Sequence, residues 1–189
     1  MKRLAATASA LILGAASATT YAHGLHGGVG FGAGFAHPFL GIDHVFAMVV
    51  IGMYAVQVRR GFRLSVGAAA LAAIAAGALL GAPPAAPFFE GIVALSVCAL
   101  GLMLLAGRAI APAWAILGIL VFTFAHGVMH AVEQPVEFGT PEYVAGVLAA
   151  SAELQLVGAA LAIVLKQHVR LAGMSIAAAG ACILIAAVM

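Results

Sequence analysis

Long apolar runs alternate with short polar breaks along nearly the whole chain after residue 37. A membrane-spanning helix needs about 20 mostly apolar residues, and six runs approach that length. Because a helix satisfies its own backbone hydrogen bonds in hydrocarbon, the pattern predicts an all-α membrane protein, a six-transmembrane-helix bundle over residues 38–189. The six spans are expected at Pro38–Val58, Leu64–Gly81, Phe88–Ala106, Pro112–Val132, Tyr143–Leu165 and Leu171–Val188.

The first residues have the three parts of a secretory signal. Lys2 and Arg3 form a basic start, an apolar stretch runs over residues 4–18, and Thr20 to Ala22 offer a small-residue cleavage site. We therefore expect a cleavable signal peptide at residues 1–22, with an uncleaved signal anchor as the alternative.

Residues 23–37 are predicted to form a periplasmic leader rich in glycine and histidine. After cleavage His23 would be the first residue, and its α-amine and ring nitrogen would suit metal binding together with the nearby His26. The glycines from Gly24 to Gly34 indicate a flexible tether for this pair. A solvated, unstructured leader without a metal role explains the same composition.

Composition limits what else the chain can do. Hydrophobic residues make up 65% of the chain and charged residues 7%, which leaves no room for a soluble domain and argues against nucleic-acid binding. Cys98 and Cys182 both fall inside apolar runs, so we expect small buried hydrophobic side chains rather than a disulfide or a thiolate metal site.

The basic residues predict an orientation in the bacterial inner membrane. They occur in alternate breaks, while the breaks near Pro83 and Glu137 contain no lysine or arginine. Cytoplasmic loops carry the excess of positive charge, so the pattern places both mature termini in the periplasm. The basic breaks hold Arg59, Arg60 and Arg63; then Arg108; and then Lys166 and Arg170.

Two short stretches place imidazoles and carboxylates inside apolar runs that should be free of them. Burying a charge in hydrocarbon costs about 3 kcal/mol on insertion scales, so such residues usually mark function. Imidazole nitrogen with carboxylate oxygen suits Ni²⁺, Co²⁺, Zn²⁺ or Cu²⁺, and we expect a metal site facing the periplasm. Its ligands are predicted to be His37, Asp43, His44, His126, His130 and Glu133.

Helical geometry supports this grouping. At about 100° per residue, His126, His130 and Glu133 fall within about 60° of one another on one stripe. His37 and His44 differ by about 20° if the first span is one regular helix. A single histidine near a helix end is more often an interfacial hydrogen-bonding residue, but three aligned polar groups favour a site.

Two further carboxylates are expected to have accessory roles. Glu90 opens the third span on the same side as the histidines, although the helix dipole alone would favour an acid there. Glu153 lies in the middle of the fifth span and is a candidate relay for a cation or a proton. Met48, Met53, Met103 and Met129 are expected to pack in the core rather than to bind metal.

With these residues the chain resembles the HupE/UreJ family of bacterial membrane proteins. The family motif HxxxxxDH is matched from His37 to His44, and the motif FHGxAHGxE is matched at four positions of the fourth span. These are His126, Gly127, His130 and Glu133; the chain departs from the motif at Ala125, Met129 and Ala131. The resemblance implies nickel entry, or cobalt entry in some members, for metalloenzymes such as hydrogenase or urease.

The prediction is therefore a secondary permease that moves Ni²⁺, or Co²⁺, from periplasm to cytoplasm, with the ion as its substrate and no cofactor. No nucleotide-binding GxxxxGK[ST] motif is present. One alternative is an intramembrane zinc-dependent hydrolase, against which Gly127 follows His126 where an HExxH motif needs glutamate. Another is a metal-sensing accessory subunit.

Overall fold

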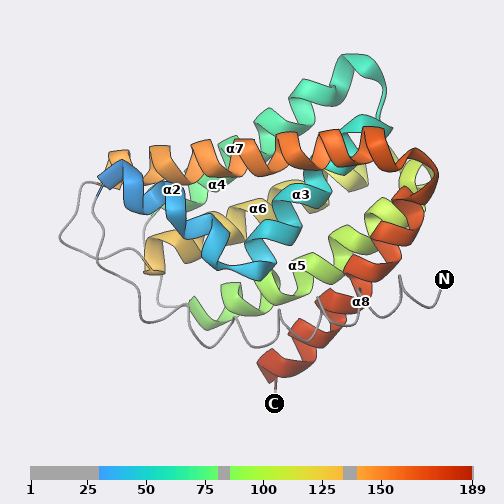
Figure 1. The fold of residues 1–189 in the computed structure, drawn as a ribbon. Helices are drawn as coiled ribbons and strands as arrows, with labels where there is room; N and C mark the ends of the chain where they lie inside the picture. The colour runs from blue at the N-terminus through green and yellow to red at the C-terminus, as the bar shows by residue number, and fades with distance from the viewer. Residues whose placement is uncertain (1–29, 81–85, 134–139, 189) are drawn as a thin grey trace.

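The computed structural model describes residues 30–80, 86–133 and 140–188, and within these ranges its regular elements are all helical (Figure 1). The helices are α2 Gly30–Leu40, α3 Ile42–Gln57, α4 Arg63–Leu80, α5 Ala86–Ala106, α6 Pro112–Glu133, α7 Thr140–Leu165 and α8 Val169–Val188. Short 3₁₀ turns occupy Arg60–Phe62, Gly107–Ala109 and Lys166–His168. The predicted signal peptide, His23 and His26 lie outside the described residues.

The predicted class is confirmed, but the predicted number of spans is not. Four helical segments are long and apolar enough to cross a membrane, and the bent pair α2–α3 would make a fifth. One of the four, Pro141–Ala186, has 46 residues and contains both α7 and α8. Figure 1 shows the chain turning back between these two helices, at the 3₁₀ turn Lys166–His168.

The first predicted span is broken, which corrects the expectation of one regular helix from Pro38. Helices α2 and α3 meet at 86°, and Gly41 between them is extended at φ −93° and ψ 112°. Pro38 lacks the amide hydrogen that would donate a hydrogen bond in the last turn of α2. A Cβ on Gly41 would lie 2.9 Å from Asp43 Oδ1, so glycine leaves room there for the carboxylate. The condition for the 20° relation between His37 and His44, a single regular helix, is therefore not met.

The glycine-rich segment is also more ordered than expected. Helix α2 begins at Gly30, so the predicted flexible tether is wrong for residues 30–34. Gly34 lies against α7, where a Cβ would collide with the backbone carbonyl of Tyr143. Small residues let two helices approach closely in lipid, and this contact holds α2 along α7.

A second close contact fixes α6, the helix of the second motif. A Cβ on Gly127 would collide with the backbone of Ile74 in α4, and a Cβ on Gly77 would collide with the backbone of Phe124 in α6. Because this face of α6 packs on α4, its histidines face α3 and α5 instead.

The surface and the interior are both apolar. Leu64 is 89% exposed and Val164 is 79% exposed, as expected where helices face lipid tails. Met48, Met53, Met103 and Met129 are buried, which confirms their predicted role in packing. Cys98 and Cys182 are free thiols, as predicted. Cys98 is only partly buried and Cys182 is exposed, so the predicted burial is wrong for Cys182 and met only in part for Cys98.

Candidate metal centre

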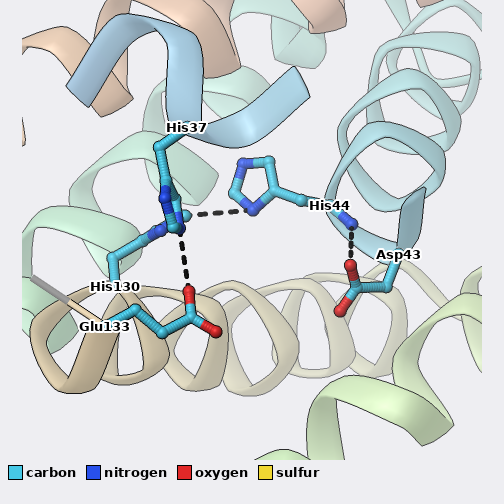
Figure 2. A network of polar contacts seen from close by, with 5 residues as sticks. All are labelled: His37, Asp43, His44, His130 and Glu133. Atoms are coloured by element: carbon cyan, nitrogen blue, oxygen red, sulfur yellow. Dashed lines mark hydrogen bonds and ion pairs between the residues drawn. The ribbon is translucent and has the colours of Figure 1, made fainter. Parts of the chain in front are cut away.

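The two polar motifs meet at one end of the helical bundle. His37 lies in the last turn of α2 and His44 in the first turn of α3, so the bend at Gly41 brings both toward α6. There they meet His130 and Glu133, from the last turn of α6 (Figure 2). The basic residues of the described chain follow α3, α5 and α7 at the ends remote from this cluster.

Three of these side chains have the geometry of metal ligands. His37 Nε2 lies 2.8 Å from Glu133 Oε2, and His37, His130 and Glu133 each offer a ligand atom within 4.8 Å of the other two. Around an ion bound at about 2.1 Å, neighbouring ligand atoms lie roughly 3 Å apart, so small side-chain movements suffice. We call His37, His130 and Glu133 the outer trio.

The outer trio is partly exposed to the surroundings. Glu133 is 44% exposed and His37 18% exposed at the side chain, whereas His130 is buried. His130 Nδ1 has no hydrogen-bond partner among the residues that the structure describes. A buried polar atom without a partner is costly, and a metal ion bound to Nδ1 would remove that cost.

Behind His130 a chain of polar contacts runs into the bundle. His130 Nε2 lies 3.1 Å from His44 Nδ1, and His44 Nε2 lies 3.1 Å from Ser151 Oγ on α7. If each Nε2 donates its hydrogen inward, His130 Nδ1 carries a free lone pair. That is the arrangement of a metal-binding histidine whose second ring nitrogen is held by a polar neighbour.

His126 is held by a different contact, and its proton position follows from the geometry. Ser96 on α5 donates its only hydroxyl hydrogen to the carbonyl of Val93, at 2.7 Å. The contact of 3.1 Å between His126 Nε2 and Ser96 Oγ therefore needs the hydrogen from His126. His126 Nε2 is occupied by Ser96, while its ring packs edge-on against His44 with ring centroids 5.1 Å apart.

The remaining predicted residues lie outside the outer trio. Asp43 Oδ1 accepts a hydrogen bond of 2.9 Å from the amide of His44 (Figure 2). Its charge is also close enough to act on His126. Glu90 is exposed in the first turns of α5. Glu153 is exposed on α7 and has no hydrogen bond or ion pair with any described residue, and its predicted role stays a prediction.

Three residues near the histidines were missed by the sequence analysis. Ser96 and Ser151 contact His126 and His44, and Tyr143 on α7 lies beside His37 with ring centroids 5.9 Å apart. Serine and tyrosine are common enough in apolar spans that they attract no attention alone. Their spacing carries no signal either, because each contact joins two different helices.

Several helical segments are able to cross a membrane, and a histidine–carboxylate cluster lies at one end of them. These features define a multi-pass membrane protein with a candidate metal site. The family model described as HupE / UreJ protein matches residues 10–187, and the chain belongs to this family. It is 35% identical over 172 residues to Protein HupE of Rhizobium leguminosarum bv. viciae, covering 87% of this chain and 90% of that protein. No solved structure matches the chain.

Proposed function

We propose that the protein is a secondary transporter that binds Ni²⁺, with Co²⁺ as an alternative substrate, and carries it into the cytoplasm. The observation that supports this proposal is the outer trio. Its two imidazoles and one carboxylate come from α2 and α6, and their ligand atoms lie within 4.8 Å of one another. Nitrogen and oxygen donors without thiolate suit divalent ions of this kind. The HupE/UreJ family is associated with nickel or cobalt uptake for hydrogenase or urease, which favours these two ions among the candidates.

The direction of transport follows from the proposed topology. Six spans, a cleaved signal peptide and the positive-inside rule together give an inner-membrane protein with both mature termini in the periplasm. The outer trio then opens to the periplasm, and the basic turns face the cytoplasm. An ion that carries two charges gains about 5 kcal/mol per 100 mV on moving inward, so the membrane potential can drive uptake.

Transport also needs a change of shape. On the cytoplasmic side of His44 and His126 the interior is filled by fully buried apolar side chains such as Met48, Ile51 and Ile119. A hydrated ion does not cross such a layer, because burying an unpaired charge there is strongly unfavourable. We infer that the described conformation is closed to the cytoplasm and that the helices around these side chains must rearrange to release the ion.

The proposal is tested by ⁶³Ni²⁺ uptake into proteoliposomes that carry an inside-negative potential. His130→Ala should abolish saturable uptake, because it removes the ligand atom that has no other partner. His168→Ala is the matched control, since this histidine lies in an exposed 3₁₀ turn remote from the cluster, and its uptake should be unchanged.

Normal uptake by folded His130→Ala would remove the outer trio from the transport path. No uptake by the wild-type protein, combined with metal-dependent cleavage of a lipid or peptide, would favour the zinc hydrolase. Metal binding with neither uptake nor cleavage would favour the sensing subunit.

A further inference from the structure

Tyr143 carries a second buried polar atom without a partner, close to the outer trio. Its side chain begins in the first turn of α7 and is 4% exposed, and its hydroxyl has no hydrogen-bond partner among the described residues. Buried tyrosine hydroxyl groups usually find a partner. The described part of the chain has three such side-chain atoms, and two of them, on Tyr143 and His130, lie beside the same site.

The position of the ring points to what the hydroxyl group is for. The Tyr143 ring lies 5.9 Å from the His37 ring, and the His37 ring lies 4.9 Å from the His130 ring, between centroids. The hydroxyl is also close enough to Glu133 for the carboxylate charge to act on it. Tyr143 therefore lies beside His37 and within range of the Glu133 charge, although it is not itself one of the three ligands.

Three protein ligands do not complete the coordination of a divalent transition metal, and water fills the open positions. A metal-bound water is a strong hydrogen-bond donor that needs an acceptor. A neutral phenol oxygen is a poor metal ligand but a good acceptor. We propose that the outer trio takes its ion with at least one water still bound, and that Tyr143 is the positioning residue whose hydroxyl oxygen accepts a hydrogen bond from this water.

This inference rests on the proposed function, since it assumes a metal at the outer trio. It adds that the substrate is a partly hydrated ion and that binding fixes a water as well as the metal. Residues that hydrogen-bond to the ligands of a metal ion typically weaken metal affinity by about 10-fold to 100-fold when they are removed.

The test compares Tyr143→Phe with Tyr54→Phe in purified full-length protein in lipid nanodiscs. Tyr143→Phe keeps the ring against His37 and removes only the hydroxyl, and Tyr54 in α3 is an equally buried control at 4% exposure. By Ni²⁺ titration calorimetry we expect the Kd of Tyr143→Phe to rise about 10-fold and that of Tyr54→Phe to stay unchanged. The metal-free Tyr143→Phe should melt no lower than wild type, because it loses an unpaired hydroxyl.

Lower affinity without lower melting temperature separates a role in binding from a role in folding. A wild-type Kd in Tyr143→Phe, while His130→Ala loses binding, would overturn the inference about Tyr143 and leave the outer trio standing. Retained binding in His130→Ala would instead overturn the proposed site.

A second measurement needs no variant. Cu²⁺ binds strongly to nitrogen and oxygen donors and serves as a paramagnetic probe of the same ligands. In D₂O, pulsed EPR of Cu²⁺ bound to the wild-type protein should show deuterons of a coordinated water. Their absence would overturn the inference that the ion is bound in hydrated form.

Discussion

At the scale of single residues, the hydrogen bonds decide which histidine is available to a metal ion. His44 uses both ring nitrogens, for His130 and Ser151, and His126 uses Nε2 for Ser96. His130 Nδ1 has no hydrogen-bond partner in the part of the chain that the structure describes. Under the proposed function, His130 would bind the ion through Nδ1, and His44 would hold its ring in place from the other nitrogen.

The ligand chemistry predicts how uptake depends on external pH. A protonated imidazole cannot bind a metal ion, and the ordinary pKa of histidine is about 6.5. As external pH falls through roughly 6, protons compete with the ion, so the half-saturating Ni²⁺ concentration should rise while the maximal rate is retained. Initial ⁶³Ni²⁺ uptake, measured at several Ni²⁺ concentrations and a clamped membrane potential, checks this. A half-saturating concentration that stays constant between pH 5 and 8 would exclude imidazole ligands.

At the scale of helices, close backbone contacts set the direction in which each motif faces. Gly127 packs against the backbone of Ile74, so α6 is held with this face on α4. The bend at Gly41 acts on the other side of the site, because it turns α2 by 86° relative to α3. In this bent arrangement His37 on α2 reaches Glu133 and His130 on α6, and these contacts make the outer trio.

Glycine substitutions test the contact between α4 and α6. Gly127→Ala should destabilise the protein by about 1–3 kcal/mol, because its Cβ would force the helices apart. Gly91→Ala is the control, since a Cβ there has nothing within 4 Å and alanine favours the helix by about 0.5–1 kcal/mol. Unfolding of the purified variants in detergent measures both effects. Equal stability of the two variants would show that the tight contact does not support the fold.

At the scale of the whole molecule, the basic residues and the histidine cluster lie at opposite ends of the helices. In the described ranges the basic residues follow α3, α5 and α7, and the histidine cluster lies where α3 and α7 begin and α6 ends. Glu153 stands apart from both, since it is exposed in the middle of α7. Its predicted role as a relay stays untested, and no hydrogen bond or ion pair joins it to another residue of the described ranges.

Cysteine labelling tests the proposed orientation. After replacement of Cys98 and Cys182 by alanine, Pro141→Cys at the site end should react with a membrane-impermeant maleimide in intact spheroplasts. Gly61→Cys, exposed in the turn between α3 and α4, should react only after the membrane is disrupted. The reverse pattern would place the outer trio in the cytoplasm and contradict uptake as the direction of transport.

Much of the fold and part of the site could be predicted from the sequence. Apolar runs predicted helices, because hydropathy and helical propensity depend on neighbours along the chain. The alignment of His126, His130 and Glu133 was also readable, since it lies within one helix. The break at Gly41 was not, because Pro38 and Gly41 are also tolerated inside membrane helices and neither alone predicts an 86° turn.

The sequence by itself determined an all-helical membrane protein of the HupE/UreJ family with two histidine–carboxylate motifs. Only the tertiary structure decided which of those residues meet, leaving His37, His130 and Glu133 together and Asp43 apart. It also supplied Ser96, Ser151 and Tyr143 from helices that carry neither motif. The physical reason is that contacts between helices depend on how each helix is rotated and how closely its backbone approaches the next, and these are properties of pairs of distant segments.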